Sequence, residues 1–97
     1  MKVVNINESD YDVYIGRPSK YGNPFIIGKD GNRLEVIRKY DKYIRNNKKL
    51  LEDLSELEGK ILGCYCKPRK CHGDVLVKLI QEMKISSFFK QEKENDT

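Results

Sequence analysis

The 97-residue chain contains no tryptophan, a single histidine and only three cysteines. It also lacks any apolar run approaching the roughly 18 residues needed to span a bilayer. Its opening residues, MKVVN, turn polar too early for a signal peptide. These absences predict a cytoplasmic protein with no membrane partner. A chain this short can bury one modest core, so a single domain with a single site is expected.

Net charge is also low, because 19 Lys and Arg face 15 Asp and Glu. Most lysines stand among acidic residues on predicted helices, as on an ordinary solvated surface, so the charge supports nucleic-acid binding only weakly. Two segments differ: no carboxylate occurs from residue 17 to 29 or from residue 60 to 73, although both segments carry several cations. This local pattern favours an anionic ligand.

Short apolar segments and helical spacing together predict the fold. Strands are expected over residues 2–7, 12–15 and 60–66, the first two forming a hairpin or lying side by side. Helices are expected over residues 33–45, from about 48 to a stop at Gly59, and over 74–84, with Asn32 and Asp74 as N-caps of the first and third. Leu34 is among the apolar positions that give the first helix its spacing.

This order predicts an α/β fold: a small Rossmann-like three-layer domain with a short, mostly parallel sheet and about three helices. The domain is expected over residues 1–88, followed by a disordered polar tail over residues 89–97. If the strands at 12–15 and 60–66 are parallel, the loops at 15–25 and 64–74 both leave carboxyl ends of strands. Open α/β sheets bind their ligands there.

The 15–25 loop is rich in glycine, cations and rings. Arg17 offers a planar fork to an oxyanion and Lys20 a point charge, while Tyr21 or Phe25 could stack on a base. The alternative is a simple turn with both rings in the core. The ligand-binding candidates of this loop are Gly16, Arg17, Ser19, Lys20, Gly22, Asn23, Pro24 and Phe25.

The 64–74 loop leads into the start of a helix, whose free amides and dipole favour a phosphate or carboxylate. Its ligand-binding candidates are Cys66, Lys67, Arg69, Cys71, His72, Gly73 and Asp74. The same position lowers a thiol pKa, so Cys71 could act as a nucleophile with His72 as acid or base, in an enzyme that processes nucleosides or nucleotides.

The cysteines leave two further alternatives. An odd number in a chain without an export signal argues against a disulfide framework. Cys64, Cys66, Cys71 and His72 have the number and kind of donors that zinc needs, although the C-x-C spacing suits tetrahedral binding less well than C-x2-C. Cys64 and Cys66 could equally be small buried hydrophobes.

The two loops resemble the signature of a small bacterial and phage family, domain of unknown function 4326. Its I-G-R and G-N-P-F elements stand here at residues 15–17 and 22–25, and its C-x-C-x-P and C-H-G-D elements at 64–68 and 71–74. Tyr65 replaces a tryptophan usual in the family. The resemblance implies one domain carrying both motifs and a fold similar to Rossmann-like nucleotide-handling domains, with no activity attached.

The leading hypothesis is a cytosolic domain that binds a nucleotide-derived or other phosphate-bearing small molecule between the 15–25 and 64–74 loops. Such a domain could sense or sequester a signalling nucleotide. It needs no cofactor. The enzyme using Cys71 and His72 and the structural zinc module stay open as alternatives, as does assembly into a homo-oligomer.

Overall fold

The computed structural model describes residues 2–95, with side chains described as far as Lys84. Three strands, β1 (Lys2–Asn5), β2 (Val13–Tyr14) and β3 (Ile61–Cys64), form a parallel sheet in the order β1-β3-β2. The helices are α1 (Arg33–Arg45), α2 (Lys48–Asp53), the 3-10 turn η1 (Leu54–Leu57) and α3 (His72–Asn95). The predicted α/β fold, with a short parallel sheet and three helices packed on it, is confirmed.

The order of the strands corrects one expectation. β1 and β2 are neither a hairpin nor neighbours, because β3 lies between them and pairs with both. The chain turns away from β1 at Asn5, whose side-chain oxygen accepts from the amide of Asn7 (2.8 Å) and whose carbonyl accepts from Glu8 (3.0 Å). These bonds end β1 earlier than predicted. The α1–α2 crossover then returns the chain to β3, parallel to β2.

Helix α1 begins where its sequence predicts. The Asn32 side chain accepts from the amide of Glu35, and the Glu35 carboxylate accepts in return from the amide of Asn32, a complete capping box. Val36, Tyr40 and Ile44, spaced four apart, form the buried face of the helix. Leu34 is 51% exposed, so its predicted place in the helical stripe does not bring it into the core.

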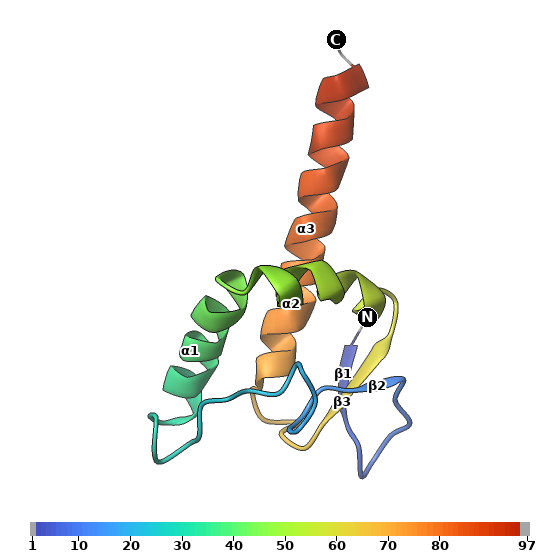
Figure 1. The fold of residues 1–97 in the computed structure, drawn as a ribbon. Helices are drawn as coiled ribbons and strands as arrows, with labels where there is room; N and C mark the ends of the chain where they lie inside the picture. The colour runs from blue at the N-terminus through green and yellow to red at the C-terminus, as the bar shows by residue number, and fades with distance from the viewer. Residues whose placement is uncertain (1, 96–97) are drawn as a thin grey trace.

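Helix α3 begins two residues earlier than predicted. His72 opens the helix, and Asp74 lies in its first turn, where its carboxylate accepts from the amide of Cys71 (3.2 Å). Asp74 therefore satisfies the helix start from within the helix rather than as its N-cap. The helix also runs past the predicted end at Lys84 to Asn95 and extends away from the rest of the fold (Figure 1).

The predicted tail over residues 89–97 stays a prediction. Its backbone continues α3 as far as Asn95, and its last two residues lie outside the described part of the chain. Within residues 2–95, no helix combines the length and the apolar character that crossing a membrane requires.

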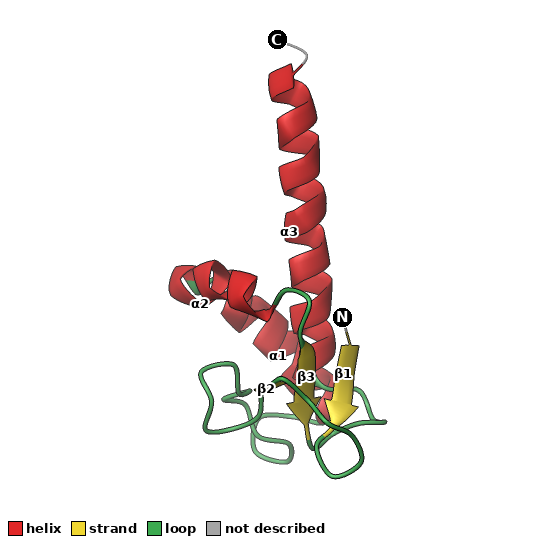
Figure 2. Ribbon diagram, turned by 90° about the vertical axis from the view of Figure 1, so that its right-hand side faces the viewer, coloured by secondary structure: helices red, strands yellow, loops and turns green. Residues whose placement is uncertain are grey.

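The core lies between the sheet and the helices. Its fully buried side chains come from every layer and include Ile15, Tyr40, Ile44, Leu54, Leu57, Leu62 and Leu76. Figure 2 shows that the loops gather at the carboxyl ends of the strands, away from the far end of α3. Both predicted site loops therefore lie at one end of the molecule.

Candidate functional site

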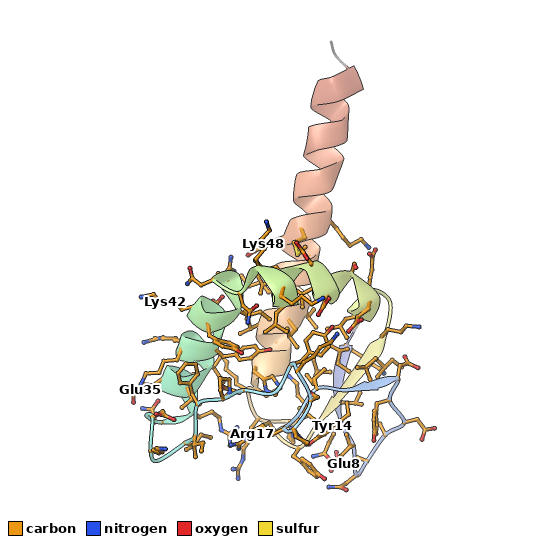
Figure 3. All side chains as sticks on the ribbon, viewed as in Figure 1. Glu8, Tyr14, Arg17, Glu35, Lys42 and Lys48 are labelled. Atoms are coloured by element: carbon orange, nitrogen blue, oxygen red, sulfur yellow. The ribbon has the colours of Figure 1, made fainter. Side chains whose placement is uncertain are left out.

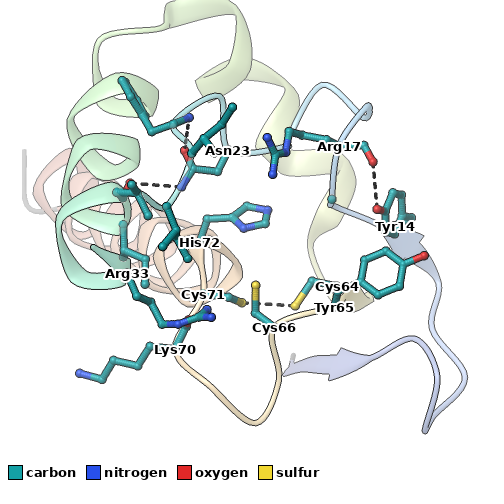
Figure 4. A pocket seen from close by; sticks show the side chains of 16 residues that line it. Tyr14, Arg17, Asn23, Arg33, Cys64, Tyr65, Cys66, Lys70, Cys71 and His72 are labelled. Carbon is teal, nitrogen blue, oxygen red and sulfur yellow. Dashed lines mark hydrogen bonds between the residues drawn. The ribbon is translucent and has the colours of Figure 1, made fainter. Parts of the chain in front are cut away.

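A pocket of about 440 Å³ lies at this loop-bearing end, between the 15–25 loop, the 64–74 loop and the start of α1 (Figure 4). Its volume is in the range of sites for small organic ligands. The first loop contributes Gly16, Arg17, Asn23 and Phe25 to the lining, and the second contributes Cys66, Cys71 and His72. The structure thus brings seven of the predicted ligand-binding residues together around one cavity.

The other predicted residues do not line the pocket. They are Ser19, Lys20, Gly22, Pro24, Lys67, Arg69, Gly73 and Asp74. Pro24 and Arg69 are exposed. The Ser19 hydroxyl is buried and has no hydrogen-bond partner within the described residues. Most of the other residues in this set are engaged in contacts within the protein.

Lys20 faces away from the pocket toward α2 and η1. Its ammonium group lies 2.8 Å from the Glu56 carboxylate and 3.2 Å from that of Asp53. The hydrogen bond with Lys20 lowers the pKa of both carboxyl groups. Tyr21 is buried and its hydroxyl donates to the Asp53 carbonyl (3.0 Å). Tyr21 is therefore a core residue rather than a platform for a base.

Lys67 and Asp74 pair with each other inside the second loop, with 2.6 Å between ammonium and carboxylate. Two glycines serve the packing of the chain on itself. A Cβ on Gly73 would come 2.7 Å from the Ile15 side chain, and a Cβ on Gly22 would come 2.9 Å from Cγ of Arg17. The absence of a side chain at Gly22 thus lets the loop pack closely against Arg17 and sets the position of the Arg17 Cα.

Asn23 ties the first loop to α1. Its amide nitrogen donates to the Val36 carbonyl (3.1 Å), and its side-chain oxygen accepts from the amide of Phe25 (2.9 Å). Phe25 in turn contacts the edge of the Tyr43 ring, with 6.1 Å between centroids. Asn23 lines the pocket, but these bonds give it a positioning role for the loop and for the Phe25 ring.

Three cations line the pocket: Arg17, Arg33 and Lys70. Figure 4 places the guanidinium groups of Arg17 and Arg33 on opposite sides of the cavity, with His72 between them, and shows the Lys70 side chain running outward beside Arg33. Arg33 donates to the Lys70 carbonyl (3.1 Å), which joins α1 to the second loop. Within the described residues none of the three forms an ion pair, and no carboxylate lines the pocket.

Arg33 was not among the site residues predicted from the sequence. It occupies the first position of α1, where the helix dipole disfavours a cation. A cation at this unfavourable helix position was the sequence signal that could have identified Arg33 as a site residue. Figure 3 shows the contrast with ordinary surface lysines: Arg17 lies at the loop-bearing end beside Tyr14, whereas Lys42 and Lys48 lie on the helices away from it.

The remaining wall is apolar and aromatic, and it was also missed. Ile26 and Ile27 line the cavity although they are 40% and 50% exposed, and Val36 and Ile37 of α1 continue the same wall. Adjacent isoleucines in a loop otherwise rich in glycine and polar residues were the signal. Tyr14 and Tyr65 complete the lining, with their rings edge to face at 6.1 Å.

Cys64 and Cys71 meet at the pocket, with 3.3 Å between their sulfurs. Both are almost fully buried and neither is in a disulfide. The hydrogen bond between the two thiols, together with the backbone amides of Cys66 and Lys67, lowers the pKa of Cys64. Donation to Cys64, together with burial, raises the pKa of Cys71. Cys64 rather than Cys71 is the acidic thiol.

His72 is buried against the Tyr40 ring, with 5.0 Å between centroids. Its Nε2 lies 2.7 Å from the Ile15 carbonyl, which only accepts, so this nitrogen carries the proton. Burial lowers the pKa of His72 below its usual value. The imidazole is therefore neutral near pH 7, and its one N–H holds the 15–25 loop against α3.

The four predicted zinc donors all line the pocket, since Cys64, Cys66, Cys71 and His72 border it (Figure 4). Two of the sulfurs nevertheless contact each other, and the imidazole Nε2 is engaged by a backbone carbonyl, which leaves Nδ1 as the one free nitrogen. Across the described part of the chain, no three histidine, cysteine or acidic side chains are arranged to hold a metal ion. The observed geometry fits a thiol and imidazole floor better than a zinc centre.

Comparison with known proteins gives a family but no activity. A family model described as "Domain of unknown function (DUF4326)" matches residues 2–82. An uncharacterised 12.4 kDa protein from the nrdA-td intergenic region of Enterobacteria phage T4 is 37% identical over 87 residues, covering 84% of this chain and 79% of the phage protein. An uncharacterised protein of Acanthamoeba polyphaga mimivirus is 40% identical over 86 residues, covering 70% of this chain and 65% of the viral protein. No solved structure matches the chain.

Proposed function

We propose that this chain, which belongs to the DUF4326 family, a domain of unknown function, binds a phosphate-bearing, nucleotide-derived small molecule in its pocket. One observation carries this proposal. Arg17, Arg33 and Lys70 line a cavity of about 440 Å³ that no carboxylate borders, in a chain where 15 of 97 residues are acidic. Unpaired cations around a cavity attract an anion of matching size.

The two kinds of wall suit the two parts of a nucleotide. The guanidinium groups of Arg17 and Arg33 can each give paired hydrogen bonds to phosphate oxygens. Phe25 and the isoleucines Ile26 and Ile27 offer apolar surface to a base. The site also lies at the carboxyl ends of parallel strands, where α/β proteins bind their ligands.

Binding fits the contacts better than turnover by Cys71 and His72. The pKa of Cys71 is raised, which opposes formation of its thiolate. His72 is neutral and its one N–H is engaged by the Ile15 carbonyl. The pocket lacks a carboxylate that could serve as a base. A domain that senses or sequesters a signalling nucleotide requires none of these groups.

We propose that the protein works in the cytosol, because an odd number of cysteines, three in this chain, does not suit the disulfide framework of a small secreted domain.

A thermal-shift panel of nucleotides, their matching nucleosides and inorganic phosphate tests the proposal. At a ligand concentration about 100 times Kd, binding adds about 2.7 kcal/mol and raises Tm by the order of 10 °C. We expect such a rise with at least one nucleotide and a smaller rise with its nucleoside. Arg17→Ala should abolish the difference, while Lys20→Ala keeps it. A panel without any shift in the wild-type protein would contradict the proposal.

A further inference from the structure

The two buried sulfurs at the pocket have a geometry that nucleotide binding does not require. Cys64 ends β3 and Cys71 directly precedes α3, seven residues apart in the chain. Their sulfurs are 3.3 Å apart, so a bond of about 2.05 Å needs an approach of little more than 1 Å. Both residues border the pocket, which gives a small molecule a route to them.

We propose that Cys64 and Cys71 form a redox-active dithiol that a small hydroperoxide, such as hydrogen peroxide, converts to an intramolecular disulfide. Cys64 is the attacking thiolate and Cys71 is the resolving thiol. This assignment is independent of the nucleotide-binding proposal, because it uses the sulfurs and not the cations of the pocket.

The two steps balance without any further reactant. The Cys64 thiolate attacks one oxygen of the peroxide, the O–O bond breaks, and a sulfenic acid forms as hydroxide leaves and takes up a proton to become water. The Cys71 sulfur, losing its proton, then attacks the Cys64 sulfur, and the sulfenic oxygen leaves as a second water. Two thiols are oxidised by two electrons, and one peroxide is reduced to two waters.

The surroundings of the sulfurs support this division of roles. The two thiols share one hydrogen bond, and a Cys64 thiolate also accepts from the backbone amides of Cys66 and Lys67, whereas Cys71 has the single amide of Gly73. The Lys67 ammonium adds a favourable charge. Cys71 keeps its proton until the first step has removed the negative charge from Cys64. Cys66, the third thiol, is more exposed than either but has no sulfur partner within the described residues.

The order in which the three cysteines are oxidised distinguishes this proposal from nonspecific oxidation of the most exposed thiol. Oxidation governed by exposure would reach Cys66 first, because Cys64 and Cys71 are 1% and 2% exposed. The dithiol predicts the reverse order. The disulfide between Cys64 and Cys71 should form at peroxide levels that leave Cys66 alkylatable, and a thiol reductant should reverse it.

Peptide mass spectrometry on the full chain tests this order. After peroxide treatment, alkylation and unfolding, trypsin separates residues 61–69, with Cys64 and Cys66, from residues 71–78, with Cys71. We expect these two peptides joined and short of two hydrogens, with one alkylated cysteine in the first. Fragmentation should place the alkyl group on Cys66.

Three variants sharpen the assignment. Cys66→Ser should form the disulfide at the wild-type rate, and Cys71→Ser should accumulate a sulfenic acid on Cys64 that dimedone traps. Cys64→Ser should leave Cys71 reduced. If Cys64→Ser does not fold, the time course of the three sites in the wild type still decides. Oxidation of Cys66 ahead of the pair, a disulfide that includes Cys66, or no joined peptide would overturn the proposal.

Discussion

Arg17 and Lys20 belong to the same loop and meet opposite surroundings. At the pocket rim, Arg17 faces a cavity that no carboxylate borders. Lys20 instead contacts a pair of carboxylates, Asp53 of α2 and Glu56 of η1, which we call the acidic patch. The chain thus uses one cation of this loop to attach it to the helices and leaves the other for a ligand. A cationic residue therefore indicates a binding site only where the structure shows that no carboxylate of the protein pairs with it.

Removing the charge of Arg17 at the pocket rim should have the largest effect on ligand affinity. Arg17→Ala deletes a charge-assisted hydrogen bond to the ligand, which is worth about 1.5–3 kcal/mol. We expect a loss of affinity on the order of 10- to 100-fold with little change in Tm of the free protein, because Arg17 is exposed and forms no ion pair within the described residues. Isothermal titration with the nucleotide identified by the thermal-shift panel measures the loss. An unchanged Kd would remove Arg17 from the site.

Adding a carboxylate to the rim should come next in size. Ile27→Glu places a negative charge on a half-exposed position of the pocket wall, where it would repel a phosphate and compete for the cations. We expect about tenfold weaker binding of the nucleotide at low salt, an effect that salt screens. The matched Ile27→Gln variant removes the same apolar surface without the charge. Equal losses for the two variants would mean that charge is not what the rim selects.

The pH dependence of folding tests the uncharged floor of the pocket. Burial lowers the pKa of His72 in the folded protein, so below pH about 6.5 the unfolded chain takes up a proton that the folded chain does not. Stability should therefore fall as pH drops from 6.5, by at most about 1.4 kcal/mol per pH unit. Urea unfolding between pH 5 and 7.5 measures the slope, relative to His72→Gln. That window lies above the range where Asp53 and Glu56 titrate, since their pKa values are lowered. The Cys64 thiol, whose pKa is lowered toward this window, is present in both proteins, so the difference between their slopes reports His72. A wild-type slope no steeper than that of the variant would refute a neutral buried His72.

Breaking the acidic patch should have the smallest effect. Lys20→Ala removes two surface ion pairs in which the Lys20 side chain is 48% exposed, and such pairs contribute about 0–1 kcal/mol. Asp53, the less exposed carboxylate, keeps its ion pair with Lys49. We expect less than 1 kcal/mol of lost stability and less than a twofold change in nucleotide affinity. Denaturant unfolding and titration on the same preparation give both numbers. Were Lys20→Ala to weaken binding as strongly as Arg17→Ala, the distinction between rim and patch would be wrong.

Local patterns were enough to predict the elements of the fold but not their pairing. The Asn32 cap and the apolar spacing of α1 act within a few residues, and each predicted strand and helix exists. The insertion of β3 between β1 and β2 depends on contacts between residues about 50 to 60 positions apart. Nothing in either strand by itself specifies its neighbour.

The site shows the same division between local and distant information. Composition marked both loops that the structure brings to one pocket, because glycine and cations without acids distinguish a segment by themselves. It could not separate Arg17 from Lys20, since the carboxylates that bind Lys20 lie 33 and 36 positions later. It also could not bring Arg33 to the pocket, because that depends on how α1 packs against the second loop.

The central claim is that the rim selects a phosphate-bearing molecule. Purified wild-type protein and Arg17→Ala, incubated with the same cell extract, washed and heat-denatured, can be compared by mass spectrometry of the released small molecules. We expect a nucleotide-derived, phosphate-bearing compound to be enriched on the wild type, retained by Lys20→Ala and lost from Arg17→Ala. The claim is contradicted if the wild type and Arg17→Ala release the same set of compounds.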